Sequence, residues 1–103
     1  MGKIKFVVVG ARWFDKVNGN TYHSVRVTRC DDGAQIAAPF QYGYDNHYRQ
    51  TALELMAKTG WIKPKYKTAD QWNLLGYEAE NDYPINWNVT DGLKRDCIAN
   101  GKL

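Results

Sequence analysis

A chain of 103 residues and 11.8 kDa has room for one hydrophobic core, which excludes a second domain, so residues 1–103 are expected to fold as one. Its 44% hydrophobic and 24% charged residues are typical of a globular protein, and the net charge of +3 does not require a polyanionic partner. The aromatic share of 14% is high, and Trp and Tyr serve a small core and an interface equally well.

The first third of the chain predicts an antiparallel β-meander. The run Phe6–Val9 is aromatic or β-branched throughout and does not alternate, so it is expected inside the sheet, and Gly10 predicts a bend or a close approach of another element. Asn18-Gly19 is typical of a two-residue type I′ hairpin turn, and Asp31–Gly33 predicts a second turn. The three expected strands are Ile4–Asp15, Thr21–Cys30 and Ala34–Gln41.

The two-residue turn also sets the expected register of the first hairpin. It places Trp13 opposite Ser24 and Ala11 opposite Arg26. Because alternate residues of a strand point to the same side of a sheet, Trp13, Tyr22 and Arg26 are predicted to share one face.

The clearest helical pattern covers Asp45–Thr59. Asp45 is expected to cap the first turn with its carboxylate, and Gly60 followed by Trp61 is typical of a Schellman ending. The predicted buried stripe consists of Tyr48, Ala52, Leu55, Met56 and Thr59.

Three further elements are expected after this helix. Thr68 to Gln71 has a capping-box pattern and predicts a short helix that ends at Gly76, followed by an acidic loop over Glu78–Asp82. The alternation over Tyr83–Val89 predicts a half-buried strand, with Pro84 at a sheet edge or a strand start. The last helix is expected to begin at Thr90 and Asp91 and to stop at Asn100-Gly101.

These elements predict an α+β fold. We expect an antiparallel sheet of three to four strands, formed by the N-terminal β-meander with Tyr83–Val89 as the fourth strand. The sheet is expected to pack against one main helix, with two short helices completing the core.

The cysteine and hydropathy patterns argue against a disulfide-rich, a metal-binding and a membrane-spanning protein. Cys30 and Cys97 form no Cys-x-x-Cys unit, so reduced and partly buried thiols are expected, with a single bridge between them as the alternative. The two histidines form no cluster with cysteine, so no metal site or cofactor is predicted. The apolar run at Phe6–Val9 is far shorter than the roughly 20 residues that span a bilayer, and it ends at Arg12 without a cleavage site. A cytoplasmic protein with no membrane partner is expected.

The first candidate site is the sheet face that carries Trp13, Tyr22 and Arg26. Two aromatic rings beside an arginine can form an interaction hot spot for a protein or a stacking platform for bases. The alternative is that a helix or the C-terminal segment covers this face, which would make Trp13 a core residue.

The second candidate site is the basic segment after the main helix. Lys63, Lys65 and Lys67 could contact phosphates while Tyr66 stacks on a base. The alternative is a solvated loop that Trp61 anchors to the core.

No catalytic constellation is predicted. His23 and Asp15 lie near each other in the hairpin but on opposite faces, and the sequence holds no Gly-rich phosphate loop or zinc-protease motif. Asp45 or His47 could complete an acid–base set with them, but a meander of this size offers no obvious cleft. The acidic loop Glu78–Asp82 is expected to be solvated, with contact to a basic partner as the alternative.

The N-terminal half resembles small proteins encoded by bacteriophages and related mobile elements. The resemblance rests on Phe6–Gly10, Arg12–Ser24 and Tyr42–Tyr44, and it covers roughly the first 60 residues. It implies no particular activity, but it favours an accessory protein that binds a host protein or nucleic acid. The expected function is therefore non-enzymatic binding of a host protein through Trp13, Tyr22 and Arg26, with nucleic-acid binding through the lysine segment as the alternative.

Overall fold

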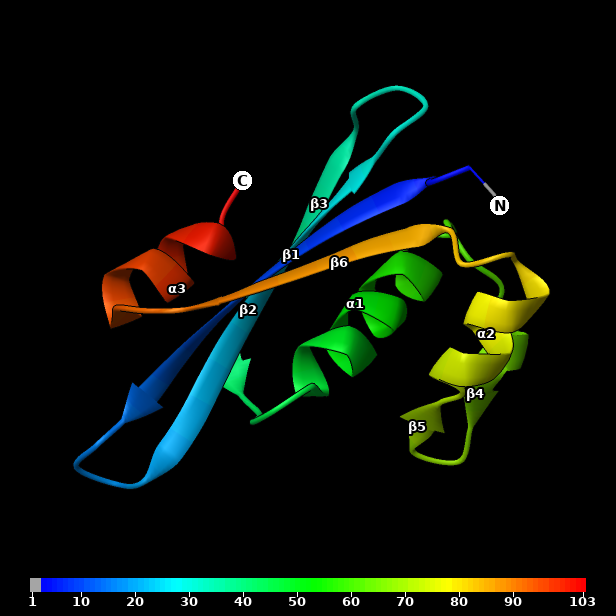
Figure 1. Cartoon of the computed structure of the whole chain (residues 1–103). Helices are drawn as coiled ribbons and strands as arrows, with labels where there is room; N and C mark the ends of the chain where they lie inside the picture. The colour runs from blue at the N-terminus through cyan, green and yellow to red at the C-terminus, as the bar shows by residue number, and fades with distance from the viewer. Residues whose placement is uncertain (1–2) are drawn as a thin grey trace.

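The computed structural model describes residues 3–103, and within them it contains a mixed four-stranded sheet and three α-helices (Figure 1). The strands of the sheet are β1 (Phe6–Asp15), β2 (Asn20–Arg29), β3 (Gln35–Tyr42) and β6 (Ile85–Asp91), in the spatial order β3-β2-β1-β6. The helices are α1 (His47–Lys58), α2 (Leu74–Glu80) and α3 (Lys94–Asn100). Between α1 and α2 lie the 3-10 turn η1 (Pro64–Tyr66) and a small hairpin of β4 (Lys67–Thr68) and β5 (Gln71–Trp72). The predicted α+β class and N-terminal meander are confirmed.

The helices lie on both faces of the sheet. In Figure 1, α1 and α2 are on one side of the strands and α3 is on the other. Neighbouring residues of β2 show the same division, because Val25 is buried in the core with α1 while Ser24 and Arg26 bond to the backbone of α3. The tip of the β1–β2 hairpin extends beyond the helices (Figure 1).

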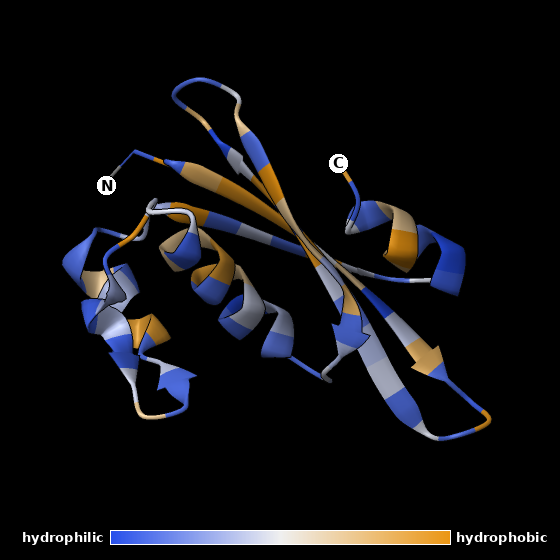
Figure 2. Cartoon of the chain, turned by 180° about the vertical axis from the view of Figure 1, so that it is seen from behind, coloured by the Kyte–Doolittle hydropathy of each residue, from blue (hydrophilic) through white to orange (hydrophobic). Residues whose placement is uncertain are grey.

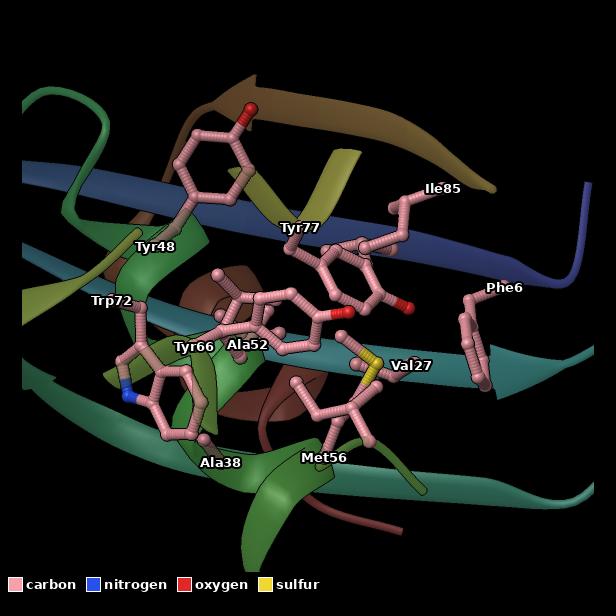
Figure 3. Close-up of a cluster of buried hydrophobic side chains, with 14 residues drawn as sticks. Phe6, Val27, Ala38, Tyr48, Ala52, Met56, Tyr66, Trp72, Tyr77 and Ile85 are labelled. Atoms are coloured by element: carbon pink, nitrogen blue, oxygen red, sulfur yellow. The ribbon is translucent and has the colours of Figure 1, made fainter. Parts of the chain in front are cut away.

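The main core lies between α1 and the sheet. β1 is an inner strand, as its unbroken apolar run predicted, and Figure 2 shows that its first half is hydrophobic. Rings from the segment after α1, those of Tyr66, Trp72 and Tyr77, close the core (Figure 3). The fully buried aliphatic residues include Val8, Val25, Val27, Leu53 and Met56. Burial of each such aliphatic side chain stabilises the folded protein by about 1.5–3 kcal/mol relative to leaving it exposed.

Gly10 of β1 allows α1 to approach the sheet closely. A Cβ atom at this position would lie 2.6 Å from Cδ2 of the Tyr48 ring. The close approach predicted for Gly10 is therefore confirmed, and the neighbouring element is α1.

The loop of the β1–β2 hairpin is longer than predicted. Asp15 pairs with Asn20, so the loop holds Lys16–Gly19 and the predicted two-residue turn is wrong. The reason is the Asp15 carboxylate, which accepts hydrogen bonds from the backbone N–H groups of Val17 at 3.0 Å and Asn18 at 3.3 Å.

This longer loop shifts the hairpin register by two residues. Trp13 is paired with Tyr22 instead of Ser24, and Arg26 is paired with Val9 instead of Ala11. Because side chains alternate with a period of two, a shift of two leaves every side chain on its predicted face.

Helix α1 ends as predicted but begins later. Gly60 has φ 84°, and the Trp61 N–H donates to the Met56 carbonyl at 2.8 Å, which is the Schellman pattern. The predicted cap at Asp45 is wrong, because Asp45 has φ 56° in the turn that leads from β3 into the helix, and helical residues begin at His47.

The helix predicted from Thr68 to Gly76 is also wrong in its first half. The Thr68 hydroxyl donates to the Gln71 carbonyl at 3.3 Å and caps no helix. The side chain of Gln50 on α1 accepts from the Trp72 N–H at 2.6 Å and donates to the Trp72 carbonyl at 3.1 Å. Gln50 thus bonds the backbone of Trp72 as a neighbouring strand would, which keeps this segment extended while the Trp72 ring enters the core.

Helix α2 starts after Asn73, whose side-chain oxygen accepts from the Gly76 N–H at 3.1 Å. The helix runs into the predicted acidic loop Glu78–Asp82, so most of that loop is helical. Glu78 is buried and accepts a hydrogen bond of 2.5 Å from Nε1 of Trp87. It is therefore a structural residue and is not solvated.

The fourth strand pairs in the opposite sense to the prediction. β6 runs parallel to β1, with Ile85 beside Phe6, and the Pro84 carbonyl at its start accepts from the Phe6 N–H at 3.2 Å. The parallel arrangement arises because the chain crosses one face of the sheet through α1 and α2 before it returns to the end at which β1 begins.

The C-terminal helix begins later than predicted. Thr90 and Asp91 belong to β6, and α3 starts at Lys94. The structure contains no bridge between the two cysteines: Cys97 on α3 is buried, as expected, whereas Cys30 is exposed, contrary to the prediction. No helix in residues 3–103 is long and apolar enough to cross a bilayer.

Candidate binding surface

Four aromatic rings gather at the end of the sheet that carries the β1–β2 hairpin. Trp13 of β1 stacks on Tyr22 of β2 with ring centroids 5.8 Å apart, and Tyr22 stacks on Phe40 of β3 at 5.0 Å. The Tyr42 ring meets Tyr22 edge-on at 5.9 Å. We call these residues the aromatic cluster: Trp13, Tyr22, Phe40 and Tyr42.

Helix α3 leaves the aromatic cluster partly uncovered. Trp13, Tyr22 and Phe40 are half-buried, and Tyr42 is 58% exposed. Helix α3 is only seven residues long and is held by bonds to β1 and β2 further along the sheet, as those of Ser24 show. The sequence offered two hypotheses for this face, an exposed binding surface or a surface covered by a helix. The structure has some of each, because α3 covers one part of the face and leaves the aromatic rings of the other part partly exposed.

Arg26 does not belong to this open part. Its guanidinium donates to the backbone carbonyls of Asn100 at 3.3 Å, Ala99 at 3.3 Å and Lys102. These are carbonyls at the C-terminal end of α3, where a cation satisfies acceptors that the helix leaves free. The structure thus brings Trp13 and Tyr22 together and uses Arg26 to hold α3.

A lysine replaces the expected arginine beside the rings. Nζ of Lys94 lies 5.3 Å from the Trp13 ring centroid and 5.9 Å from that of Phe40, within the range of a cation–π interaction. Two or more stacked rings with a cation at their margin can bury large apolar area on a partner at a low cost in side-chain entropy.

The basic segment is largely engaged within the protein. Lys65 pairs with Glu80 at 2.8 Å and Lys67 with Glu54 at 3.4 Å. Tyr66 is buried, and its hydroxyl accepts a hydrogen bond from the Asn81 side chain at 3.0 Å. A base therefore cannot stack on Tyr66 in this structure.

Lys63 lies at a shallow groove of about 300 Å³ at the end of the molecule opposite the hairpin. The groove is shared with Lys5, Lys65 and the ring of Trp61. Lys63, Lys65 and Lys67 thus do not form one row of free cations, since two of the three are paired with carboxylates.

Of the ionisable groups considered for catalysis, His23 and His47 lie close together, whereas Asp15 does not face His23. Nδ1 of His23 lies 3.1 Å from the Gly43 carbonyl, which can only accept, so Nδ1 carries the proton and Nε2 accepts from the Thr51 hydroxyl at 2.7 Å. Burial lowers the pKa of His23, and the nearby His47 ring, 5.2 Å away between centroids, lowers it further. Asp15, by contrast, holds the hairpin loop.

A groove of about 370 Å³ with both polar and apolar lining runs between α1, β3 and the β4–β5 hairpin. Its main charged groups already bond one another. Glu54 accepts from Nε1 of Trp72 at 2.8 Å and pairs with Lys67, and the Trp72 bond is the largest cause that lowers the pKa of Glu54. Within the described range, no three His, Cys, Asp or Glu side chains gather so that they could hold a metal ion.

No family model matches this chain, and neither a curated protein nor a solved structure is significantly similar to it. The resemblance of the N-terminal half to small bacteriophage proteins thus stays a prediction.

Sequence reasoning missed three residues of the surface. Phe40 and Tyr42 alternate with Gln41 at the end of the third strand, and this pattern was available, although the predicted strand stopped before Tyr42. Lys94 gave no local signal, because it reaches the rings only when α3 packs on the sheet.

Proposed function

We propose that this chain is a non-enzymatic accessory protein that binds another protein, a host protein if the phage resemblance holds, through the aromatic cluster. The observation that supports the proposal most directly is the stack of Trp13, Tyr22 and Phe40, which α3 leaves half-open with Lys94 at its margin. Large rings that stay partly exposed beside a cation are typical of interaction hot spots.

Nucleic-acid binding is the second candidate. Its support is Lys5 and Lys63 at the groove that Glu80 and its partner Lys65 also line, although the burial of Tyr66 leaves the aromatic cluster as the platform on which bases would stack.

The test compares the wild type with a double variant, Trp13→Ala with Tyr22→Ala. The matched control is Phe14→Ala, because Phe14 is 53% exposed on the opposite face of the same strand. Each protein is immobilised and incubated with nuclease-treated cell lysate, and the recovered partner is then purified and titrated. The double variant should weaken the affinity at least about tenfold, and Phe14→Ala should leave it unchanged. Equal affinity of the double variant and the wild type would contradict the proposal.

A salt titration separates the two candidates. A labelled single-stranded oligonucleotide is titrated with the wild type at low ionic strength and again with added salt. Protein binding alone predicts no measurable affinity for the oligonucleotide. Binding that falls steeply as salt rises would support the second candidate instead, because cations that neutralise phosphates release counterions.

A further inference from the structure

The two edges of the sheet differ in how well they are protected. β3 forms one edge, and it contains Pro39 and a break in register between the pairs of His23 and Val25. A proline and a bulge are the devices by which proteins keep an edge strand from pairing with another chain. β6 forms the other edge and has neither device, since its register with β1 is unbroken from Ile85 to Asp91.

The backbone of β6 offers free hydrogen-bonding groups on its outer side. The Gly92 N–H donates to the Arg12 carbonyl and the Pro84 carbonyl accepts from the Phe6 N–H, so the even-numbered residues of this segment bond to β1. In a strand, alternate residues direct their backbone groups to opposite sides. The residues that direct their N–H and C=O groups outward, where the described chain places no further strand, are Ile85, Trp87, Val89 and Asp91.

The side chains of β6 are complementary to a second copy of themselves. When two such strands pair antiparallel about a two-fold axis at Asn88, Trp87 lies opposite Val89 of the second copy. This is an aromatic and β-branched pair, which stabilises a sheet. The same register places Asn86 opposite Thr90, so that polar side chains meet on the other face.

The backbone groups fit the same register. With the axis at Asn88, Trp87 pairs with Val89 and Ile85 pairs with Asp91, so every outward-facing residue meets another outward-facing residue. Asp91 is the only charged residue of β6 and is already paired with Arg12 at 2.7 Å, so no like charges face each other across the junction.

We propose that β6 is an interface between two copies of this chain, joined antiparallel with Asn88 on the two-fold axis. The two sheets then form one continuous sheet. The aromatic cluster involves β1, β2 and β3, so both copies would keep it available, and this interface does not depend on the proposed function.

The first test measures the mass of the wild type by sedimentation equilibrium from about micromolar to millimolar concentration. The expected mass at the upper end is twice the 11.8 kDa of one chain. Val89→Pro should weaken association at least about tenfold, because it removes an outward N–H and spares the bonds to β1. Val89→Lys is a second variant, in case the proline disturbs folding, and thermal melting verifies that each variant is folded. A monomer at all concentrations, or a dimer that neither variant weakens, would overturn the proposal.

The second test examines the register by oxidation of single cysteines in a Cys30→Ser background. Asn88→Cys would place two Cα atoms about 4.5 Å apart on the axis, within the range that a disulfide bridges. Asn86→Cys is the matched control, because its two copies would lie about 14 Å apart along the strands. Asn88→Cys should form a covalent dimer, and the control should not. Equal cross-linking of both variants, or none in either, would exclude this register.

Discussion

Different forces hold the helices to the two faces of the sheet. On the α1 face, apolar residues such as Val8, Val25 and Leu53 are fully buried, and burial of apolar area provides most of the stability. On the α3 face, the short helix is held by directed polar bonds: the Ser24 hydroxyl donates to the Cys97 carbonyl at 2.5 Å, and the Arg26 guanidinium bonds the helix end.

This difference explains why the binding surface lies where it does. A core that depends on buried area extends over as much of a face as its helix can cover, whereas a helix held by a few directed bonds covers only the residues near those bonds. The aromatic cluster lies beyond the residues that bond α3, and so its rings stay half-exposed.

The largest predicted effect is on the α1 face. Leu53→Ala should lower the free energy of unfolding by about 2–5 kcal/mol, because it removes a fully buried side chain and leaves a cavity. Chemical denaturation measures the change. Leu75→Ala is the control, since Leu75 is 82% exposed, and it should change stability by less than about 0.5 kcal/mol. Similar losses in both variants would show that the core is placed wrongly.

A smaller effect is expected for Arg26→Ala on the α3 face. The variant should lose about 1–3 kcal/mol, because the carbonyls at the end of α3 lose a charged donor. Hydrogen exchange should show that amides of α3 lose protection while those of α1 keep theirs. An equal loss of protection in both helices would show that α3 does not open independently of α1.

The pH dependence of stability tests whether burial between the sheet and α1 disfavours the charged form of His23. Because burial lowers the pKa of His23 in the folded protein, the unfolded chain takes up the proton first as the pH falls below about 6.5. Stability should therefore fall as the pH drops below about 6.5, by at most about 1.4 kcal/mol per pH unit, and the contribution of His23 should level off below its folded-state pKa. Thermal melts of the wild type and His23→Gln measure this. In His23→Gln, stability should no longer fall over this pH range. A fall as large as that of the wild type would show that another group causes it.

The rates at which the two thiols are labelled should show how well α3 protects its face of the sheet. Cys30 is exposed and should react at once, whereas Cys97 lies on the side of α3 that faces the sheet, and its burial raises the pKa of its thiol. Cys97 should therefore react only as fast as α3 opens, and Arg26→Ala should accelerate it. Two equally fast thiols in the wild type would show that α3 does not protect this face.

Local patterns predicted the elements that local chemistry determines. The faces of the first hairpin were right although its register was not, because a shift of two residues preserves the alternation. The end of α1 was right because Gly60 and Trp61 supply a complete local motif.

Features that depend on distant contacts could not be predicted in this way. The capping-box pattern at Thr68 is overruled by the burial of Trp72 and its two bonds to Gln50 on α1. Arg26 was read as a surface residue because nothing near it in the sequence shows that α3, some seventy positions later, would present its carbonyls there. Half of the candidate site, Trp13 with Tyr22, followed from the hairpin alone.

The pairing of β1 with β6 also has a consequence for how the protein is made. Arg12 and Asp91 are paired across this junction at a separation of 79 residues. At about 5–20 residues per second, a ribosome needs roughly 4–16 seconds to add that many residues. During this interval β1, an inner strand of the finished sheet, has an unpaired edge. The newly made chain therefore exposes this edge of β1 to other chains until β6 has been made and pairs with it.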